Sequence, residues 1–252
     1  MKIEVKGVRK DLSMAGGGYV PVFDDLNLMV EPGSFVVILG TSGCGKSTLL
    51  DMLAGLTRPC RGTISADGRE VTAPHPSRSL LFQHPSLLPW LTVTENVAFG
   101  CRVRGEVDNL EHRLEEIIAM IGLRDFAGAY PAELSLGMAQ RVCLARALLG
   151  QPRVLLMDEP FSSLDSFNRR NLQREVVNIW QRRHLTIVMV THDLEEAVLL
   201  GQRIIFLGGH PGKVRQTYDI DLPYPRDMGS EDFFKLRNEI IGELRHNYAD
   251  YF

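Results

Sequence analysis

Three short apolar runs contrast with an alternating pattern near the start of the chain. Residues 35–39, 154–157 and 186–190 are almost continuously apolar, which is typical of strands buried on both faces of a parallel sheet. Residues 2–8 and 26–30 alternate between apolar and polar side chains, so they predict half-buried strands of an antiparallel layer. The chain therefore combines two kinds of sheet.

Helical periodicity occupies most of the remaining chain. Apolar residues recur three and four positions apart over residues 94–101, 110–121 and 138–149, which predicts amphipathic helices. A helix over about 47–54 should follow the first buried strand directly, and another over about 232–247 should lie in the tail. Buried strands that alternate with helices predict a parallel α/β architecture.

The composition fits a globular protein that stays in the cytoplasm. With 252 residues, 44% hydrophobic and 23% charged, the chain can bury a sizeable core. Its longest apolar stretch, residues 35–39, is far below the roughly 20 residues that cross a bilayer, and its start lacks a secretory signal. The four cysteines show no CxxC spacing, so we expect reduced thiols. A net charge of −3 argues against a nucleic-acid partner.

A phosphate-binding loop is predicted between the strand at 35–39 and the helix that follows it. Residues 40–48 read Gly-Thr-Ser-Gly-Cys-Gly-Lys-Ser-Thr, which matches the motif of such loops. Its backbone N–H groups and the helix N-terminus face phosphate, while Lys46 neutralises charge and Ser47 ligates Mg²⁺. The expected nucleotide-binding residues are Gly40, Ser42, Gly43, Cys44, Gly45, Lys46, Ser47 and Thr48. The alternative is a glycine-rich turn with a solvated lysine.

A pair of carboxylates ends the second buried strand. Asp158 and Glu159 directly follow the apolar residues 154–157, an arrangement that delivers an acid to the edge of a parallel sheet. We expect Asp158 to hold Mg²⁺ through water and Glu159 to act as general base toward the attacking water. An isolated Asp-Glu pair would more simply be a solvated strand end, but the phosphate-binding loop favours the catalytic interpretation.

Two further polar residues follow apolar runs. Gln83 comes after Leu80-Leu81-Phe82 and would place a neutral amide within reach of both Mg²⁺ and water. His192 ends the strand at 186–190 and would contact the γ-phosphate. Taken alone, Gln83 would be a surface residue and His192 a structural histidine.

These motifs, in this order, resemble the nucleotide-binding subunit of ABC transporters, over nearly the whole chain. The most specific element is the segment 134–141 followed by 143–148. The resemblance implies an α/β P-loop ATPase core with a parallel sheet, an N-terminal antiparallel β layer and an inserted α-helical subdomain. It implies one domain over 1–252, with the core at about 1–85 and 150–209, the helical subdomain at about 86–149 and a C-terminal extension at 210–252.

The resemblance also implies a homodimer in which two copies sandwich two ATP molecules. Each nucleotide then lies between the phosphate-binding loop of one copy and the Ser135 segment of the other. Ser135 would cap a helix beginning near Met138, whose N-terminus faces the γ-phosphate. Gly137 would allow close approach, and Asp165 would cross the interface to order the partner's site. The alternative is that Ser135 merely caps its own helix.

Leu136 departs from the family pattern, and the residue that stacks on adenine has two candidates. Leu136 stands where the family has glycine, and a left-handed conformation there would add roughly 1 to 2 kcal/mol of strain. We expect Leu136 to point away from the nucleotide and the site to remain competent. For the aromatic ring that stacks on adenine, Tyr19 is preferred over Phe23, which could equally belong to the core.

The segment 83–97, with its Leu88-Pro89-Trp90, resembles importers of nitrate, sulfonates, taurine and related small solutes. The tail motifs at 211–214 and 221–226 resemble the same branch. This implies a peripheral subunit at the cytoplasmic face of the inner membrane, in which two copies bind integral membrane permease subunits and an extracytoplasmic substrate-binding protein supplies the solute. A groove beside Gln83, including Pro89, Trp90 and Leu91, would receive a permease helix.

Three alternatives remain at this point. Trp90 could be buried in the helical subdomain rather than exposed for docking. The chain could serve a lipid-transport or export complex instead of an importer. It could also be a non-transport P-loop ATPase, such as a kinase or a mechanical clamp, although a kinase has no use for the Ser135 segment and the chain has no heptad run.

Overall fold

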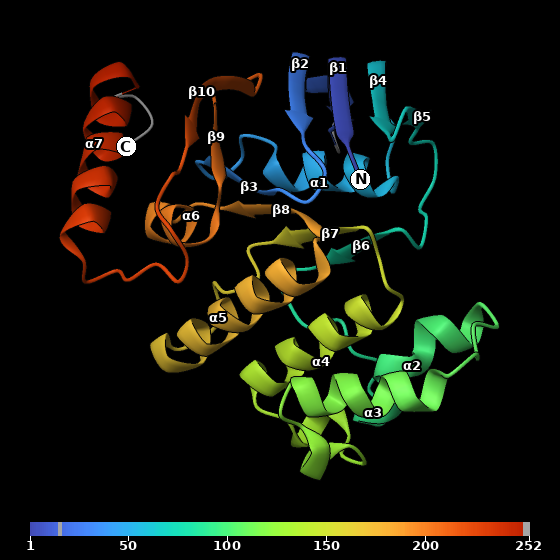
Figure 1. Ribbon diagram of the computed structural model, residues 1–252. Coiled ribbons are helices and arrows are strands. Elements are labelled where there is room, and N and C mark those ends of the chain that lie inside the picture. The colour runs from blue at the N-terminus through green and yellow to red at the C-terminus, as the bar shows by residue number, and fades with distance from the viewer. Residues whose placement is uncertain (15–16, 249–252) are drawn as a thin grey trace. The chain divides into compact units, whose positions relative to one another are not determined.

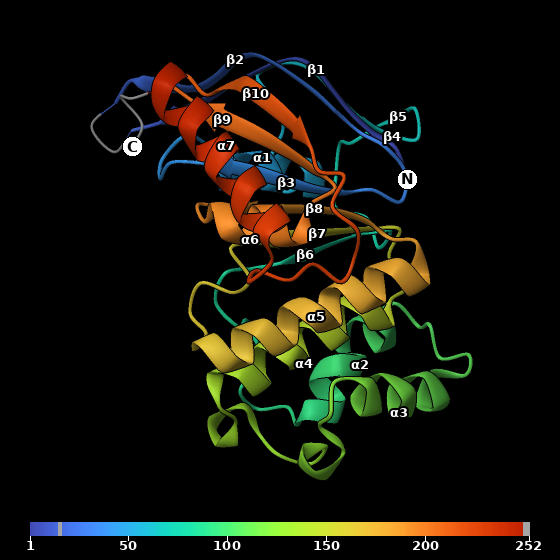
Figure 2. The same ribbon diagram turned by 60° about the vertical axis from the view of Figure 1, so that its left-hand side comes forward.

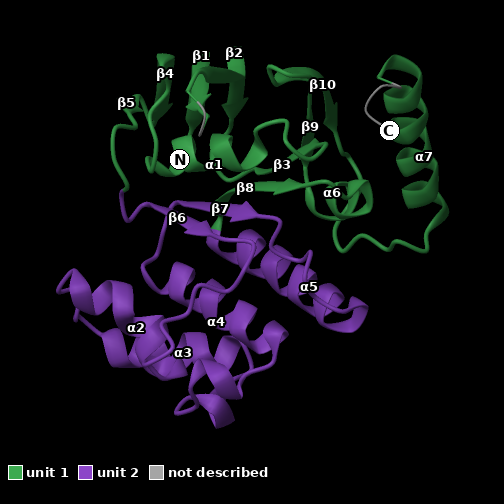
Figure 3. Ribbon diagram, turned by 180° about the vertical axis from the view of Figure 1, so that it is seen from behind, with its two compact units in different colours: residues 1–74, 184–252 green, residues 75–183 purple. Residues whose placement is uncertain are grey.

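The computed structural model describes residues 1–14 and 17–248, which form two compact units (Figure 3). The first unit comprises residues 1–74 and 184–252, and the second comprises residues 75–183. The segment 86–149, expected as a helical subdomain, lies within the second unit. That unit also takes in strands and a helix that the sequence interpretation had assigned to the core.

An antiparallel layer in the first unit contains the N-terminal strands. Its strands are β1 (Ile3–Ser13), β2 (Tyr19–Val30), β4 (Arg61–Ala66) and β5 (Arg69–Glu70), in the order β2-β1-β4-β5 (Figure 1). Ile3, Val5 and Val8 of β1 are buried, as expected for a strand with one face toward the core. The predicted antiparallel layer is confirmed, with longer strands than the alternating pattern indicated.

The second sheet of this unit is built around β3 (Phe35–Gly40). β3 pairs in parallel with both β8 (Thr186–Thr191) and β9 (Arg203–Gly208). Every residue of β3 and β8 is buried, which explains their almost continuous apolar character. β10 (Lys213–Asp219) pairs antiparallel with β9, and neither of these two strands was predicted from the sequence.

The first unit has three helices among its described residues, and each comes after a strand of this sheet in the chain. They are α1 (Lys46–Ala54), α6 (Leu194–Leu200) and α7 (Glu231–Asn247). α1 begins directly after the glycine-rich loop, as predicted. α7 buries Phe233, Ile240 and Leu244 and passes beside α6 (Figure 2). The tail is therefore a packed part of the first unit.

The second unit combines a pair of parallel strands with helices. β6 (Arg78–Leu81) pairs with β7 (Val154–Asp158), and the Ser79 hydroxyl donates to the Ala147 carbonyl at 3.1 Å. The helices are α2 (Val93–Val103), α3 (Leu110–Met120), α4 (Leu136–Leu149), α5 (Ser166–Arg183) and the short 3₁₀ helices η1 (Arg124–Phe126) and η2 (Pro131–Glu133). The helices expected at 94–101, 110–121 and 138–149 are all found. The β6–β7 pairing and its contact with α4 explain why these strands group with the helices.

A capping box begins α2 and defines the loop before it. Thr92 accepts a hydrogen bond from the Glu95 backbone N–H, and the Glu95 carboxylate accepts one from the Thr92 backbone N–H. The fully buried Asn96 donates to the carbonyls of Leu88, Leu91 and Thr92. The loop at 88–92 is therefore held by backbone contacts. None of the helices in residues 1–14 and 17–248 is long and apolar enough to cross a bilayer.

The difference in burial among the four cysteines predicts that a thiol reagent modifies one of them selectively. Cys44, Cys101 and Cys143 are buried, and burial raises the pKa of each thiol, whereas Cys60 is exposed. A disulfide reagent attacks the accessible thiolate, so we expect one thiol, Cys60, to react rapidly in the native protein and all four in denaturant. Peptide mapping of the modified protein checks the assignment, with Cys60→Ser as the control. Rapid native modification of Cys44 would contradict the packing of the glycine-rich loop.

Candidate nucleotide-binding site

The glycine-rich loop lies between the carboxyl end of β3 and the first residue of α1. Gly43 and Gly45 adopt left-handed conformations, with φ of 81° and 99°, and Gly45 is the N-cap residue of α1. A Cβ on Gly45 would lie 2.6 Å from the ring of Phe23, so only glycine fits here. Left-handed glycines directly before a helix N-terminus are the features by which an anion-binding loop turns its backbone N–H groups toward a phosphate.

Lys46 places a positive charge inside this loop. Its ammonium donates hydrogen bonds to the carbonyls of Gly40 at 2.7 Å and Thr41 at 2.9 Å, and the residue is only 6% exposed. No acidic residue occupies the first turn of α1. Backbone N–H groups, a helix N-terminus and an ammonium group together fit a nucleotide's phosphates.

The loop rests on a support that the sequence interpretation missed. The Gly212 backbone N–H donates to the Val22 carbonyl at 2.7 Å, and a Cβ on Gly212 would lie 2.4 Å from the Cys44 carbonyl oxygen. Phe23 is fully buried beside Gly45 and Gly212. The turn between β9 and β10 and the side chain of Phe23 therefore hold the loop from one side.

Of the two candidate adenine platforms, only Tyr19 is accessible. Tyr19 is 77% exposed, whereas Phe23 is fully buried. A buried ring that packs against the loop presents no free face to a base, so Phe23 belongs to the core. Stacking of adenine on Tyr19 stays a prediction.

His192 follows β8 at the same edge of the sheet as the glycine-rich loop. Thr191 is paired with Leu39 in the parallel register, so His192 and Gly40 both leave the carboxyl ends of neighbouring strands. The Thr191 hydroxyl donates to the Glu196 carboxylate at 2.9 Å and accepts from the Asp193 backbone N–H at 3.1 Å. The two residues next to His192 in the sequence are therefore hydrogen-bonded, and Thr191 is bonded to Glu196 of α6.

In the second unit, the predicted residues of β6 and β7 also share an edge. Leu81 pairs with Met157, so Gln83, Asp158 and Glu159 lie at the carboxyl ends of neighbouring parallel strands, with Asp158 as the last residue of β7. The Gln83 side-chain amide donates to the Ser162 hydroxyl at 3.3 Å, and that hydroxyl donates to the Glu159 carbonyl at 3.0 Å. The structure therefore brings Gln83 and the backbone of Glu159 together through one serine.

The backbone of Glu159 is strained. Its φ of 41° lies in the left-handed region, which non-glycine residues adopt at a cost of roughly 1 to 3 kcal/mol. Such strain is retained where it directs a functional side chain. The conformation therefore agrees with a role for Glu159 beyond ending a strand.

Gln140 of α4 is a positioning residue for which the sequence interpretation proposed no role. It is fully buried, and its amide nitrogen donates to the carbonyls of Gln83 at 3.2 Å and Pro160 at 3.0 Å. One side chain thus ties together the segments that follow β6 and β7. A glutamine at a position facing the core of an otherwise apolar helix face is the only sequence signal for it, and such a signal is weak.

Ser135 and its neighbours form the start of α4. The Ser135 hydroxyl accepts a hydrogen bond from the Met138 N–H at 3.3 Å, so it is the N-cap. The helix begins at Leu136, two residues before the expected start. Leu136 has a helical conformation and is 45% exposed, so the left-handed strain considered for it does not arise.

Gly137 connects this helix start to the loop that carries Asp165. A Cβ on Gly137 would lie 3.3 Å from the Asn168 side chain. Asn168 donates to the Asp165 carboxylate at 2.7 Å, and its side-chain and backbone hydrogen bonds lower the pKa of Asp165. The segments of Ser135 and Asp165 therefore lie side by side within the second unit.

The predicted site residues fall into two groups, one in each unit. The first unit contains Tyr19, the loop at 40–48 and His192, and the second contains Gln83, Ser135, Gly137, Asp158, Glu159 and Asp165. A phosphate-binding loop between a buried strand and a helix, with acidic residues after a second parallel strand, defines a P-loop nucleotide-binding protein.

Comparison with known proteins shows to which family of P-loop nucleotide-binding proteins the chain is similar. The sequence model of the ABC transporter family matches residues 23–162. The chain is 40% identical over 246 residues to the aliphatic sulfonates import ATP-binding protein SsuB of Bacillus cereus, which covers 98% of this chain and 97% of that protein. It is 43% identical over 251 residues to the nitrate import ATP-binding protein NrtC of Synechococcus elongatus, covering 96% of this chain and 38% of that longer protein.

A solved structure agrees with these relatives. The dimeric structure of a post-hydrolysis state of the ATP-binding cassette MJ0796, bound to ADP and Pi, has a TM-score of 0.75 and 30% identity. The match covers 88% of this chain and 100% of that chain. The chain belongs to the ABC transporter family and is an ATP-binding cassette ATPase. This confirms the resemblance and the fold class inferred from the motifs.

The helical conformation of Leu136 predicts the effect of restoring glycine. Leu136→Gly should lower the free energy of unfolding by about 0.5 to 1 kcal/mol, because glycine is a poor helix former. ATP turnover should stay within about twofold, because no left-handed strain is relieved. Thermal unfolding and steady-state hydrolysis measure the two effects, with Leu136→Ala as the control. A rise in turnover by orders of magnitude in Leu136→Gly would show that the site is detuned by leucine.

Proposed function

We propose that this chain hydrolyses ATP to power import of a small anion, of the nitrate, sulfonate or taurine type, through a separate membrane permease. The observation that carries this proposal is the similarity over nearly the full chain to ATP-binding proteins named for sulfonate import, together with the shorter match to a nitrate import protein. Both of these names specify import, which favours import over lipid transport or export.

Two copies of the chain form the active ATPase. Each nucleotide lies between the loop at 40–48 of one copy and the Ser135 helix start of the other, and Tyr19 stacks on adenine. This arrangement is supported by the capped N-terminus of α4, which carries no acidic residue in its first turn and so favours an anion. It is also supported by the dimeric cassette with ADP and Pi. Asp165 orders the partner's site across the same interface.

The hydrolytic step is assigned to four of the predicted site residues. Glu159 accepts a proton from, or polarises, the water that attacks the γ-phosphate. Gln83 orients that water, and His192 contacts the γ-phosphate. Lys46 and the backbone N–H groups of the loop stabilise the charge that builds up on the phosphate oxygens.

Mg²⁺ is the metal that this set of donors fits. Ser47, Gln83 and Asp158 offer hydroxyl, amide and carboxylate oxygens, which are the ligands of a hard cation. No group of three or more His, Cys, Asp or Glu side chains that could hold a metal occurs in the described parts of the chain. When bound, Mg²⁺ supplies positive charge that offsets the charge of the phosphates.

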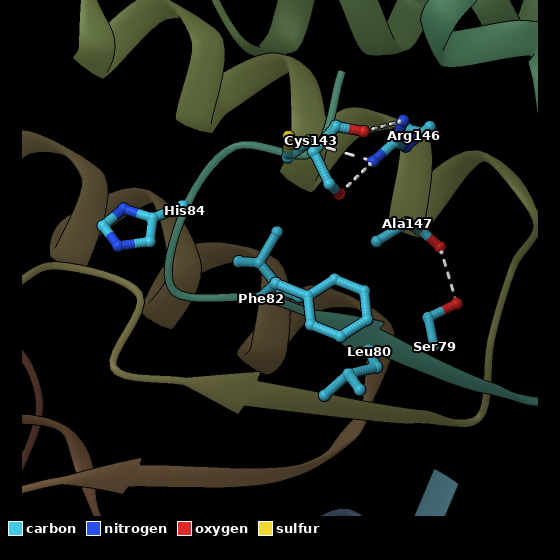
Figure 4. A pocket seen from close by; sticks show the side chains of 9 residues that line it. Ser79, Leu80, Phe82, His84, Cys143, Arg146 and Ala147 are labelled. Atoms are coloured by element: carbon cyan, nitrogen blue, oxygen red, sulfur yellow. Dashed lines mark hydrogen bonds between the residues drawn. The ribbon is translucent and has the colours of Figure 1, made fainter. Parts of the chain in front are cut away.

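The permease binds the second unit beside Gln83. A cavity of about 180 Å³ is lined by residues of β6, the segment after it and α4, including Phe82, His84 and Arg146 (Figure 4). Arg146 donates to the carbonyl and hydroxyl of Ser86, both at 2.9 Å. Trp90, on the loop held by Asn96, is 68% exposed. A loop that is held by Asn96 and exposes a tryptophan, in the same unit as this cavity, is suited to hold a short helix of the membrane subunit.

In this proposal the protein is a peripheral subunit at the cytoplasmic face of the inner membrane. It reaches the membrane only through its permease, which in turn receives solute from an extracytoplasmic substrate-binding protein. The solute does not contact this chain. Its identity is therefore decided by those two partners.

Substitution of Glu159 tests the hydrolytic roles. Glu159→Gln should retain ATP binding and lower kcat by about 10²- to 10⁴-fold, because a positioned base contributes that much. Lys46→Ala should instead lose productive binding, because the loop loses its ammonium group. Fluorescent-nucleotide titration and phosphate release separate the two effects. Steady hydrolysis by Glu159→Gln would eliminate the general-base assignment.

The decisive experiment on the dimer is light scattering of Glu159→Gln with and without ATP at low Mg²⁺. An ATP-dependent shift from monomer to dimer is expected, because slow hydrolysis preserves the closed sandwich. Adding Ser135→Arg should prevent the shift, because a bulky side chain at the cap blocks the approach of the partner. A monomer that binds ATP but never dimerises would contradict the sandwich for the isolated chain.

The exposed tryptophan predicts the site of permease binding. Trp90→Ala should weaken association with the permease by about 30-fold, the effect of losing a contact worth about 2 kcal/mol. ATP binding by the isolated chain should not change. Phe234→Ala, which removes a 49% exposed aromatic side chain from α7, is the matched control. Equal affinity of Trp90→Ala and wild type for detergent-solubilised permease would exclude Trp90 from the interface.

A further inference from the structure

The C-terminal extension caps one end of α6, the short helix that follows His192. The guanidinium of Arg226 donates to the carbonyls of Val198 and Gly201, both at 2.6 Å. It also donates to the carbonyls of Ile220 and Leu222, at 3.1 and 3.0 Å. The last carbonyls of a helix have no partners within the helix, and here an arginine from the extension satisfies them.

Tyr224 completes this cap. Its hydroxyl donates to the Leu200 carbonyl at 2.6 Å, and its ring lies 4.2 Å from the Arg226 guanidinium carbon. Burial raises the pKa of Tyr224 to about 12, so the hydroxyl remains a donor throughout the physiological pH range. The tail motif at 221–226, noted in the sequence without a role, therefore has a defined contact in the fold.

The extension also contacts the other end of α6. Arg237 of α7 forms an ion pair with Glu195, with 2.9 Å between Nε and Oε1. Exposed ion pairs contribute little to stability on their own, but this one links α7 to the first turn of α6. The two helices lie beside each other (Figure 2). The helix is thus held at its first turn and at its last carbonyls by the same extension.

The position of α6 decides the position of His192. Asp193 caps α6 by accepting from the backbone N–H groups of Glu195 and Glu196, at 2.8 and 3.3 Å. The buried Glu196 carboxylate accepts from the Thr191 hydroxyl. Both neighbours of His192 in the sequence are thereby bonded to the first turn of α6. A displacement of the helix carries the histidine with it.

We propose that the C-terminal extension is a clamp on α6 that positions His192 for ATP hydrolysis, with Arg226 as its principal residue and Tyr224 and Arg237 as its supports. The proposal rests on the proposed function of His192 at the γ-phosphate. Arg226 is a positioning residue, because its contacts are with backbone carbonyls and not with nucleotide. A rigid support of this kind matters because a displacement of about 1 Å at a reacting group can cost about a hundredfold in rate.

Hydrogen exchange measures the clamp directly in the full-length protein. Arg226→Gln should accelerate amide exchange of the segment 192–200, because α6 loses its C-terminal cap and opens locally. Ser230→Ala is the matched control, since the Ser230 hydroxyl caps α7 by accepting from the Phe233 N–H and does not cap α6. Exchange of α6 in Arg226→Gln at the wild-type rate would overturn the proposal. Tyr224→Phe provides a milder second variant that removes only one hydroxyl.

ATP hydrolysis measures the consequence for His192. Arg226→Gln should lower kcat by about tenfold or more and change KM by less than about twofold, because binding by the loop is untouched and only the histidine is displaced. Ser230→Ala should keep the wild-type kcat. Faster exchange of α6 with unchanged kcat, or equal loss of kcat in Ser230→Ala, would contradict a positioning role.

A double variant separates this role from a general loss of stability. If Arg226 acts through His192, adding Arg226→Gln to His192→Ala should cause no further loss of kcat, because effects of residues that act as a unit do not add. A full additional loss would show that Arg226 acts elsewhere. If the wild-type chain neither bound nor hydrolysed ATP, the proposed function would fail, while the exchange of α6 would still decide whether the clamp exists.

Discussion

Backbone pairing of β3 with its parallel neighbours β8 and β9 is the constraint on which the nucleotide-binding half of the first unit depends. Parallel strands end at a common edge, so sheet register brings the loop after β3 and His192 after β8 to the same edge. The pairing is stable because both β3 and β8 are buried along their whole length. The register of the sheet therefore determines which residues lie together at this edge.

In the second unit, too, a pair of parallel strands ends at a common edge, and here α4 connects the segments that follow the strands. β6 and β7 end together, and Gln140 fastens the segments that follow them by two hydrogen bonds from one buried amide. The same helix presents its capped N-terminus at Ser135. A shift of α4 would therefore displace Gln83, the segment after Glu159 and the Ser135 cap. This links the part of the chain that binds a permease in our proposal to the part that acts on nucleotide.

Both units rely on polar side chains that bind backbone carbonyls rather than substrate. Gln140 does so after β6 and β7, Asn96 does so before α2, and Arg226 does so at the end of α6. An unpaired buried carbonyl costs free energy, so each such side chain fixes a loop or helix end in one arrangement. These contacts fix the segments that carry the residues we propose for catalysis and docking.

The sequence by itself determined the glycine-rich loop, the buried strands β3, β7 and β8, the helices α2, α3 and α4 and the order of the motifs, because these depend on local conformation and on the spacing of apolar residues. It did not reveal β10, α5 or α6, whose patterns are shorter or more polar, and it also missed β9, although that strand is as long as β3 and almost as completely buried. Only the tertiary structure decided that Phe23 is buried, that Leu136 is helical and that Gln140 and Arg226 tie distant segments together. The reason is physical: these outcomes depend on burial and on hydrogen bonds between residues far apart in the chain, which no local pattern encodes.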